Sequence, residues 1–162
     1  MVARAYQHSY GLPILVARLF NTYGPGMERF VLLDFLHKLQ ANPQQLEILG
    51  TGEQQRDFAY VTDVCRALLL LGTAGGVGEA HNVSSGESVT ITALAQRLLV
   101  LLGLAGQTEL VYTGQSWAGD AQRWEVAIDK LKALGFQPAV SLDAGLQRTM
   151  AWFEDNYGAI IP

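Results

Sequence analysis

The chain has 162 residues, of which 49% are hydrophobic and 16% charged, with a formal net charge of −4 and an isoelectric point near 5.3. These values predict one globular domain with a sizeable core and exclude a disordered chain. The acidic balance gives no electrostatic footprint for nucleic acid or an anionic membrane, and no apolar run is long enough to span a bilayer.

Cysteine and histidine usage excludes further classes. Cys65 is the only cysteine, so the chain forms no internal disulfide and no thiolate metal cluster, and we expect Cys65 to be a small buried helix residue. His8, His37 and His81 lack metal-ligand spacing, so no metal site is predicted. The N-terminal residues lack the long apolar segment of a signal peptide, and a reducing cytoplasm is the expected compartment.

The start of the chain predicts a helix followed by a buried strand. Residues 2–10 have helix-forming composition and end at Gly11, a helix-stop residue. Residues 14–17 are continuously apolar, which is typical of a parallel strand covered on both faces. These elements form half of a βαβ unit, so we expect the chain to begin inside a repeat of a longer protein.

The next segment, residues 20–26, predicts a loop at the carboxyl end of that strand. Asn21 carries both donors and acceptors there, and Gly24 and Gly26 let the backbone approach a ligand closely. A simple turn is the plainer interpretation. A helix over residues 28–41 is predicted to follow, because its apolar residues recur at helical spacing.

The central stretch runs from a strand through a glycine turn towards a helix. Residues 46–49 are a short strand candidate, which Gly50 and Gly52 break into a turn. Arg56 follows at a strand-to-helix junction, where open α/β folds bind ligands. Its planar fork suits a phosphate, although on position and charge alone an ion pair with Asp57 or a surface acid, and no other role, is the more economical interpretation.

A glycine-rich segment at residues 72–78 mimics a dinucleotide-binding fingerprint. A true fingerprint opens a helix whose N-terminus holds the pyrophosphate. Residues 79–85 instead predict a short strand, and no second strand ending in an acid follows about twenty residues later. We therefore predict a loop after a buried helix that Asp63 opens and that ends near Leu71.

Short strands and helices continue to the end of the chain. We predict a buried helix capped by Thr90 or Thr92, a strand over residues 109–112, and a last helix from a Ser141 cap to about Tyr157. This alternation predicts an α/β fold.

Two motifs in this order resemble one family. They are Arg18-Leu-Phe-Asn-Thr-Tyr-Gly-Pro25 and Gly50-x-Gly-x-x-x-Arg56-Asp-Phe-x-Tyr-Val-x-Asp63. Both are similar to motifs of the NAD(P)-dependent sugar-nucleotide epimerase/dehydratase family, the extended branch of the short-chain dehydrogenases/reductases. The segment Leu134-Gly-Phe-Gln-Pro138, with the last helix, is similar to the C-terminal part of such enzymes.

The resemblance implies the C-terminal part of a Rossmann-like doubly wound fold plus a small substrate-binding subdomain. Residues 1–26 would end the Rossmann-like domain, residues 27–162 would form mostly the substrate-binding portion with returning α/β elements, and the cofactor-binding N-terminal half would be absent. The Tyr-x-x-x-Lys pair that the family uses for proton transfer does not occur in this sequence. No catalytic residue is therefore assigned, and the chain alone is expected to be inactive.

The resemblance also implies a substrate site. Asn21 would contact the diphosphate of a nucleotide-linked sugar, Arg56 would clamp a phosphate or ribose, and Leu49 would lie against the base. Asp120 or Arg123 would complete the grip from a C-terminal loop. Binding energy from the remote nucleotide can position the reacting sugar, which explains why such a clamp exists.

On the cofactor side, Leu19 and Phe20 would border the nicotinamide of NAD or NADP, most of which the absent half would hold. UDP-glucose 4-epimerisation is the first choice of reaction, and the motifs fit dehydration or reduction as well. The alternative is a non-catalytic module that binds a nucleotide or a protein partner. Apolar faces of a cut sheet also predict a homo-oligomer, and no nucleic acid or membrane partner is expected.

Overall fold

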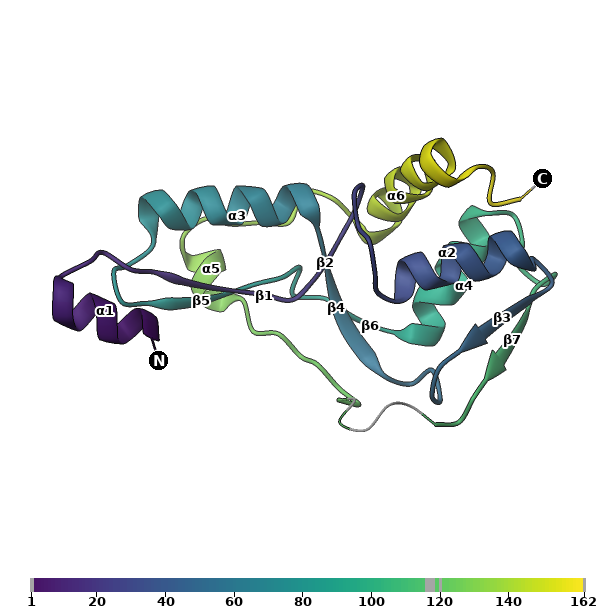
Figure 1. Cartoon of the computed structure of the whole chain (residues 1–162), viewed down its shortest axis with the longest axis horizontal. Coiled ribbons are helices and arrows are strands. Elements are labelled where there is room, and N and C mark those ends of the chain that lie inside the picture. Colours follow the sequence, from purple (N-terminus) through teal and green to yellow (C-terminus); the bar gives the residue numbers. More distant parts are fainter. Residues whose placement is uncertain (1, 116–118, 120, 162) are drawn as a thin grey trace.

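The molecule is an elongated α/β structure with its two ends far apart (Figure 1). It is a computed structural model that describes residues 2–115, 119 and 121–161. In chain order the elements are α1 (Val2–Tyr10), β1 (Val16–Leu19), β2 (Asn21–Tyr23), α2 (Val31–Ala41), β3 (Gln45–Ile48), β4 (Gln55–Tyr60), α3 (Val61–Ala74), β5 (Ala80–Val83), β6 (Ser88–Thr90), α4 (Ile91–Leu101), β7 (Glu109–Tyr112), α5 (Asp129–Ala133) and α6 (Leu142–Tyr157).

The strands form small, mostly parallel sheets. β1 pairs with β5, β2 with β4, and β3 with β7, all in parallel, whereas β6 runs antiparallel to β4. Phe20 alone separates β1 from β2, so the chain leaves one sheet and enters the next almost without a break. Helix α3 connects β4 of one sheet to β5 of another. The predicted α/β class is confirmed.

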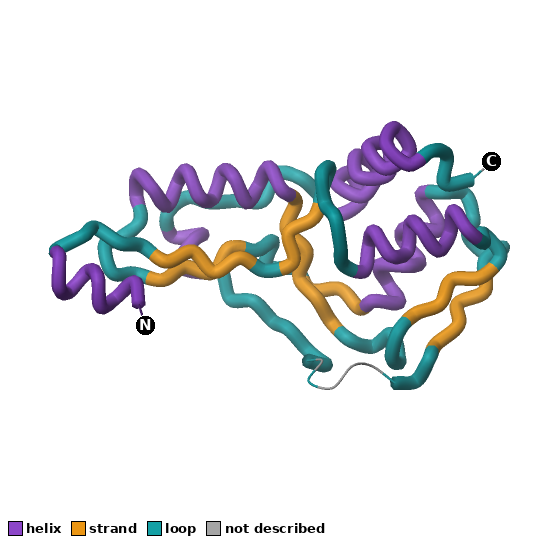
Figure 2. Tube along the Cα trace, in the orientation of Figure 1, coloured by secondary structure: helices purple, strands orange, loops and turns teal. Residues whose placement is uncertain are grey.

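Two hydrophobic clusters hold these sheets together. Figure 2 shows α3 alongside the β1–β5 pair, and α2, α4 and α6 grouped near the other end. The larger cluster joins these three helices to β3 and β4, and the smaller joins α3 to β5 and α5. Several fully buried side chains fill the larger cluster: Leu36, Leu39, Leu94, Leu98, Leu146 and Phe153. Each contributes roughly 1.5–3 kcal/mol by leaving water.

Tyr23 ties β2 to the C-terminal helix. Its hydroxyl donates a hydrogen bond to the carbonyl oxygen of Leu142 at 3.3 Å, and burial raises its pKa well above the usual range. A Cβ at Gly145 would lie 2.0 Å from the Tyr23 hydroxyl, so α6 can approach this closely only because residue 145 is glycine.

Asp63 ties the start of α3 to the same C-terminal segment. Its buried carboxylate accepts hydrogen bonds from the backbone N–H groups of Ala139 and Val140 at 3.0 Å and pairs with Arg66 at 2.7 Å. The predicted helix is present, but it begins at Val61 rather than at Asp63.

Both predicted helix caps are present. Thr90 Oγ1 accepts a hydrogen bond from the Ala93 N–H at 3.0 Å, and Ser141 Oγ accepts one from the Ala144 N–H at 3.3 Å. These bonds satisfy donors that a helix start leaves unpaired. The glycine-rich segment begins inside α3, which runs to Ala74 rather than to about Leu71, and then leads into strand β5, so it does not open a dinucleotide-binding helix.

Three predictions about the first strands and α3 need correction. The first strand is β1, Val16–Leu19, two residues later than predicted, and residues 14–17 are half-buried rather than covered on both faces. The predicted loop begins with strand β2, because Asn21–Tyr23 pair with β4. Cys65 lies on an exposed side of α3, where Leu69 is also 73% exposed, because only one face of this helix packs on the sheet.

Within the part of the chain that the structure describes, none of the helices combines the length and apolar character needed to cross a bilayer. The same residues contain no group of three or more histidine, cysteine or acidic side chains placed to hold a metal ion.

Candidate functional site

Strand β4 presents alternate side chains to one pocket. Residues two apart in a strand share a face and lie roughly 7 Å apart. Gln54, just before the strand, and Arg56 and Phe58 within it all line a cavity of about 510 Å³. The rest of the lining comes from β2, α2, the end of β3, α4 and the C-terminal loop: Asn21, Phe30, Val31, Asp34, Phe35, Leu49, Ile91, Gly119, Ala121 and Trp124.

Arg56 lies inside a strand and not, as predicted, at a strand-to-helix junction. Its Nη1 donates hydrogen bonds to the carbonyl oxygens of Gln55 and Ala121, both at 2.7 Å. Its Cζ also lies 5.4 Å from the centre of the Trp124 ring, within cation–π range. Backbone dipoles and an aromatic ring thus orient the guanidinium at the pocket wall.

The C-terminal loop that carries Trp124 is fastened to the edge of β4. The Trp124 N–H donates to the carbonyl oxygen of Gln55 at 3.3 Å, and the Gln55 N–H donates to that of Gln122 at 2.9 Å. Ser88 Oγ donates to the Trp124 carbonyl oxygen at 2.7 Å. These bonds explain how a loop distant in sequence comes to support Arg56.

Asp57, next to Arg56, serves the fold. It is completely buried, and its carboxylate accepts hydrogen bonds from the backbone N–H groups of Ser85 at 2.9 Å and Gly86 at 2.8 Å. It therefore cannot form the surface ion pair with Arg56 that the sequence also allowed. Asn21 Nδ2 donates to the Asp57 carbonyl oxygen at 3.1 Å, which sets the position of Asn21 in the pocket.

Leu49 forms another part of the lining, directly after β3. Its side chain is 54% exposed although it belongs to the pocket, so an apolar surface faces the opening. Gly50 and Gly52 follow with φ of +82° and +77°, values that glycine adopts without strain. A Cβ at Gly50 would lie 2.0 Å from Gln54 Nε2, so this turn needs glycine.

Phe30 stands at the start of α2 with a strained backbone. Its φ of 83° is the only positive value at a non-glycine residue among those the structure describes. Its side chain is 60% exposed, lines the pocket and lies 5.0 Å from the Arg29 guanidinium carbon. Such strain costs about 1–3 kcal/mol and is concentrated at functional sites.

Arg123 does not line this pocket. Arg123 is mostly exposed and forms an ion pair with Glu125, while its backbone forms a bridge with Gln55. Asp120 lies outside the described residues. Asn21, Leu49 and Arg56 are thus brought together, and Arg123 contributes through its backbone.

The residues predicted for the cofactor side lie just outside the pocket. Leu19 is exposed at the end of β1. The Phe20 ring meets the Trp124 ring edge-on, with centroids 5.9 Å apart. Trp124 therefore touches both the predicted cofactor border and the guanidinium of Arg56.

Sequence reasoning missed most of the lining, including Gln54, Phe30 and Trp124. The alternation of residues 54, 56 and 58 would have indicated Gln54 if β4 had been predicted as a strand. No sequence signal indicated Trp124, because its position depends on loop pairing with β4.

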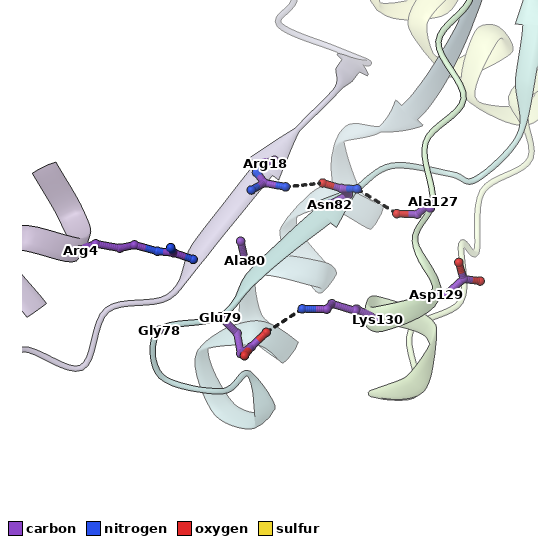
Figure 3. Close-up of a pocket in the computed structure, with 9 residues that line it drawn as sticks. All are labelled: Arg4, Arg18, Gly78, Glu79, Ala80, Asn82, Ala127, Asp129 and Lys130. Carbon is purple, nitrogen blue, oxygen red and sulfur yellow. Dashed lines mark hydrogen bonds and ion pairs between the residues drawn. The ribbon is translucent and has the colours of Figure 1, made fainter. Parts of the chain in front are cut away.

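A second cavity, of about 540 Å³, lies between α1, the β1–β5 pair and α5 (Figure 3). Three of its charged side chains have partners: Lys130 Nζ lies 2.7 Å from Glu79 Oε2, and Arg18 Nη1 donates to Asn82 Oδ1 at 3.5 Å. The hydrogen bond from Lys130, and then its charge, lower the pKa of Glu79. This cavity is open, and its lining is mainly polar and exposed.

Comparison with known proteins places the chain in a family. Residues 1–84, just over half of the chain, match the model of the NAD dependent epimerase/dehydratase family. A dTDP-glucose 4,6-dehydratase from Neisseria gonorrhoeae is 32% identical over 167 residues, covering 96% of this chain and 48% of that protein. The low-salt glycan biosynthesis protein Agl12 of Haloferax volcanii is 29% identical over 153 residues, covering 94% of this chain and 49% of that protein.

Comparison with solved structures points to the same family. A UDP-glucose 4-epimerase from Thermotoga maritima, with UDP-glucose, has a TM-score of 0.84 at 32% identity, over 96% of this chain and 50% of that one. A dTDP-glucose 4,6-dehydratase from Streptomyces venezuelae, with NAD bound, has a TM-score of 0.81 at 31% identity. The match covers 97% of this chain and 48% of that one. The chain spans about half the length of the curated relatives it matches. It belongs to the NAD dependent epimerase/dehydratase family.

Proposed function

We propose that this chain is the sugar-nucleotide-binding portion of an NAD(P)-dependent epimerase/dehydratase, and that the pocket beside Arg56 takes the nucleoside diphosphate. The observation that carries the proposal is the Arg56 guanidinium, held by two backbone carbonyls and the Trp124 ring in the same cavity as Asn21 and Leu49. A held guanidinium loses little freedom when it binds an oxyanion, and charge-assisted bonds to phosphate are strong.

The rest of the lining suits a nucleoside. Leu49, Phe30 and Phe35 supply apolar surface for a base and ribose, while Asn21 supplies a polar group close to Arg56. A volume of about 510 Å³ falls in the range of pockets that bury small molecules. The base would lie towards Leu49 and the diphosphate towards Arg56.

For the whole protein, UDP-glucose 4-epimerisation is our first choice of reaction, because a structural neighbour at 32% identity is a UDP-glucose 4-epimerase. dTDP-glucose 4,6-dehydration is the second, because several relatives at about the same identity carry that name.

NAD or NADP would accept and return a hydride during either reaction. Leu19 and Phe20 fit its border, because they lie at the carboxyl end of a parallel strand, where open α/β sheets bind dinucleotides. Their part would be to present apolar surface to the nicotinamide. This chain contains no Tyr-x-x-x-Lys pair, so we expect it to bind rather than to transfer protons.

The test uses the full-length protein. We expect UDP or dTDP to bind by calorimetry, and either UDP-glucose or dTDP-glucose to be converted in the presence of NAD, with products identified by NMR. Binding without conversion of any sugar nucleotide would favour the alternative, a non-catalytic nucleotide-binding module. Failure of both nucleotides to bind would contradict the proposal.

A further inference from the structure

Phe58 forms part of the pocket wall, two residues after Arg56 on the same face of β4. It also borders a smaller cavity of about 400 Å³ towards the start of α6, whose lining includes Leu142. A side chain with open space in two places has fewer neighbouring atoms to hold it than a fully packed one. The position of the Phe58 ring therefore depends on the side chains that do pack against it.

Tyr23 is one of these side chains. β2 pairs with β4 so that Asn21 lies beside Phe58 and Tyr23 beside Tyr60. The Tyr23 ring meets the Phe58 ring edge-on, with centroids 6.2 Å apart and planes at 88°, a favoured geometry for aromatic pairs. Tyr23 is only 3% exposed and is absent from the pocket lining, so it supports the wall from behind.

Helix α6 fixes the other end of Tyr23. The Tyr23 hydroxyl donates a hydrogen bond to the carbonyl oxygen of Leu142 at 3.3 Å. A Cβ at Gly145 would lie 2.0 Å from that hydroxyl oxygen and 2.7 Å from Cζ of the ring. Glycine is a weak helix former, so its presence inside α6 needs a reason, and the close approach of Tyr23 supplies one. The ring is thus held between α6 and β4.

Building on the proposed function, we propose that Tyr23 is a positioning residue for the nucleotide pocket. Helix α6 sets the place of the Tyr23 ring, that ring sets the place of Phe58, and Phe58 forms the wall beside Arg56. Because Asn21 lies two residues before Tyr23 in β2, the same contact also fixes the strand that carries Asn21. None of the residues of α6 lines the pocket, so the helix contributes to nucleotide affinity through Tyr23.

Gly145→Ala tests the proposal in the full-length protein, because it adds one methyl group where the Tyr23 hydroxyl lies. Calorimetry should show UDP binding weakened about fivefold to tenfold, with the number of sites unchanged. Adding Tyr23→Phe removes the closest contact and should restore UDP affinity to the level of Tyr23→Phe alone. If Gly145 served stability alone, the unfolding midpoint would change while the folded protein kept its UDP affinity.

Gly72→Ala is the matched control. Gly72 lies inside α3, and a Cβ there would meet no atom within 4 Å. The same substitution should leave UDP affinity unchanged and raise the unfolding midpoint slightly, because alanine is the better helix former.

A second set of variants follows the contact to Phe58 and serves equally if Gly145→Ala does not fold. Tyr23→Phe keeps the ring, loses only the bond to α6, and should weaken UDP binding about twofold. In a Phe58→Leu background, Tyr23→Phe should cost nothing further, because the side chain through which it acts is gone. An equal loss in that background would show that Tyr23 does not act through Phe58 and would overturn the proposal.

The outcomes separate this proposal from the proposed function. If UDP binds in an Arg56-dependent way but Gly145→Ala and Tyr23→Phe bind it like the parent, Tyr23 is structural and the proposed function stands. If Tyr23→Phe does not relieve the loss in Gly145→Ala, that loss arises elsewhere in α6, which also overturns the role of Tyr23. If the unaltered protein binds no nucleotide, the proposed function fails and the Tyr23 proposal fails with it.

Discussion

The pocket beside β4 and the cavity of Figure 3 hold Arg56 and Arg18 in different ways. In the pocket beside β4, Arg56 is half-buried and held by two carbonyl oxygens and an aromatic ring, between apolar walls. In the cavity of Figure 3, Arg18 is exposed and reaches the amide of Asn82, while Lys130 reaches Glu79.

The difference lies in the surroundings of each positive charge. Two backbone carbonyl oxygens and an aromatic ring hold the Arg56 guanidinium in place, and low surrounding polarity strengthens its attraction for an anion. An exposed ion pair such as Lys130–Glu79 has its charge met by the partner and is screened by salt. Charge alone would rank the cavity of Figure 3 at least as high, so the surroundings of the charge decide.

The largest expected effect is on stability, and it compares two carboxylates: Asp57, next to Arg56 in the sequence, and Glu79, the partner of Lys130. Asp57→Ala should lower the free energy of unfolding by about 3 kcal/mol or more, because it leaves the buried N–H groups of Ser85 and Gly86 without an acceptor. Glu79→Ala, in the open cavity, should leave the unfolding midpoint unchanged. Urea denaturation of the full-length protein measures both, and equal midpoints for the two variants would contradict the comparison.

Arg56 tests the pocket itself. Arg56→Ala should weaken UDP binding by roughly 1.5–3 kcal/mol, about tenfold to a hundredfold, through loss of charge-assisted bonds. Arg56→Lys should recover only part of this, because a point charge cannot reproduce the planar fork. Arg18→Ala is the control from the other cavity and should leave UDP affinity unchanged. If Arg56→Ala binds UDP like the parent, Arg56 is structural.

Trp124 tests whether the ring supports the guanidinium. Trp124→Ala should weaken UDP binding by about 0.5–1 kcal/mol, twofold to fivefold, and Trp124→Phe should do less harm because a ring remains. In an Arg56→Ala background, Trp124→Ala should cost nothing further. An equal additional loss in that background would show that Trp124 acts on the nucleotide directly, or only through stability.

Much of this molecule follows from local sequence signals. The caps at Thr90 and Ser141 and the strand at residues 109–112 were predictable because short-range hydrogen bonds and apolar spacing determine them. The motif residues Asn21 and Arg56 were predictable through their family resemblance, and they do lie in one pocket.

Features that depend on distant contacts were not predictable. β4 was missed because its pairing with β2 and β6 brings together segments far apart in the chain. The exposure of Cys65 depends on which face of an apolar helix meets the sheet, and an apolar run does not encode that face. Trp124 reaches Arg56 only because its loop pairs with the edge of β4.

The smallest expected effect is a change in titration within the cavity of Figure 3. The pKa of Glu79 lies below its ordinary value of 4.5, chiefly because of the hydrogen bond from Lys130 and then its charge. A lowered folded-state pKa means that the pair's contribution is present above about pH 4.5 and is lost as the pH falls through the folded value.

Lys130→Ala should therefore raise the pKa of Glu79 towards 4.5, measured by NMR titration of its side-chain carboxyl carbon, while UDP affinity and the unfolding midpoint at neutral pH stay unchanged. Loss of Lys130 should change the titration of Glu79 and no other property, because water solvates each charged group of this exposed pair nearly as well as its partner does. A Glu79 pKa that does not move would remove Lys130 as its cause. A fall in UDP affinity would mean that the two cavities are coupled, which would break the distinction drawn between them.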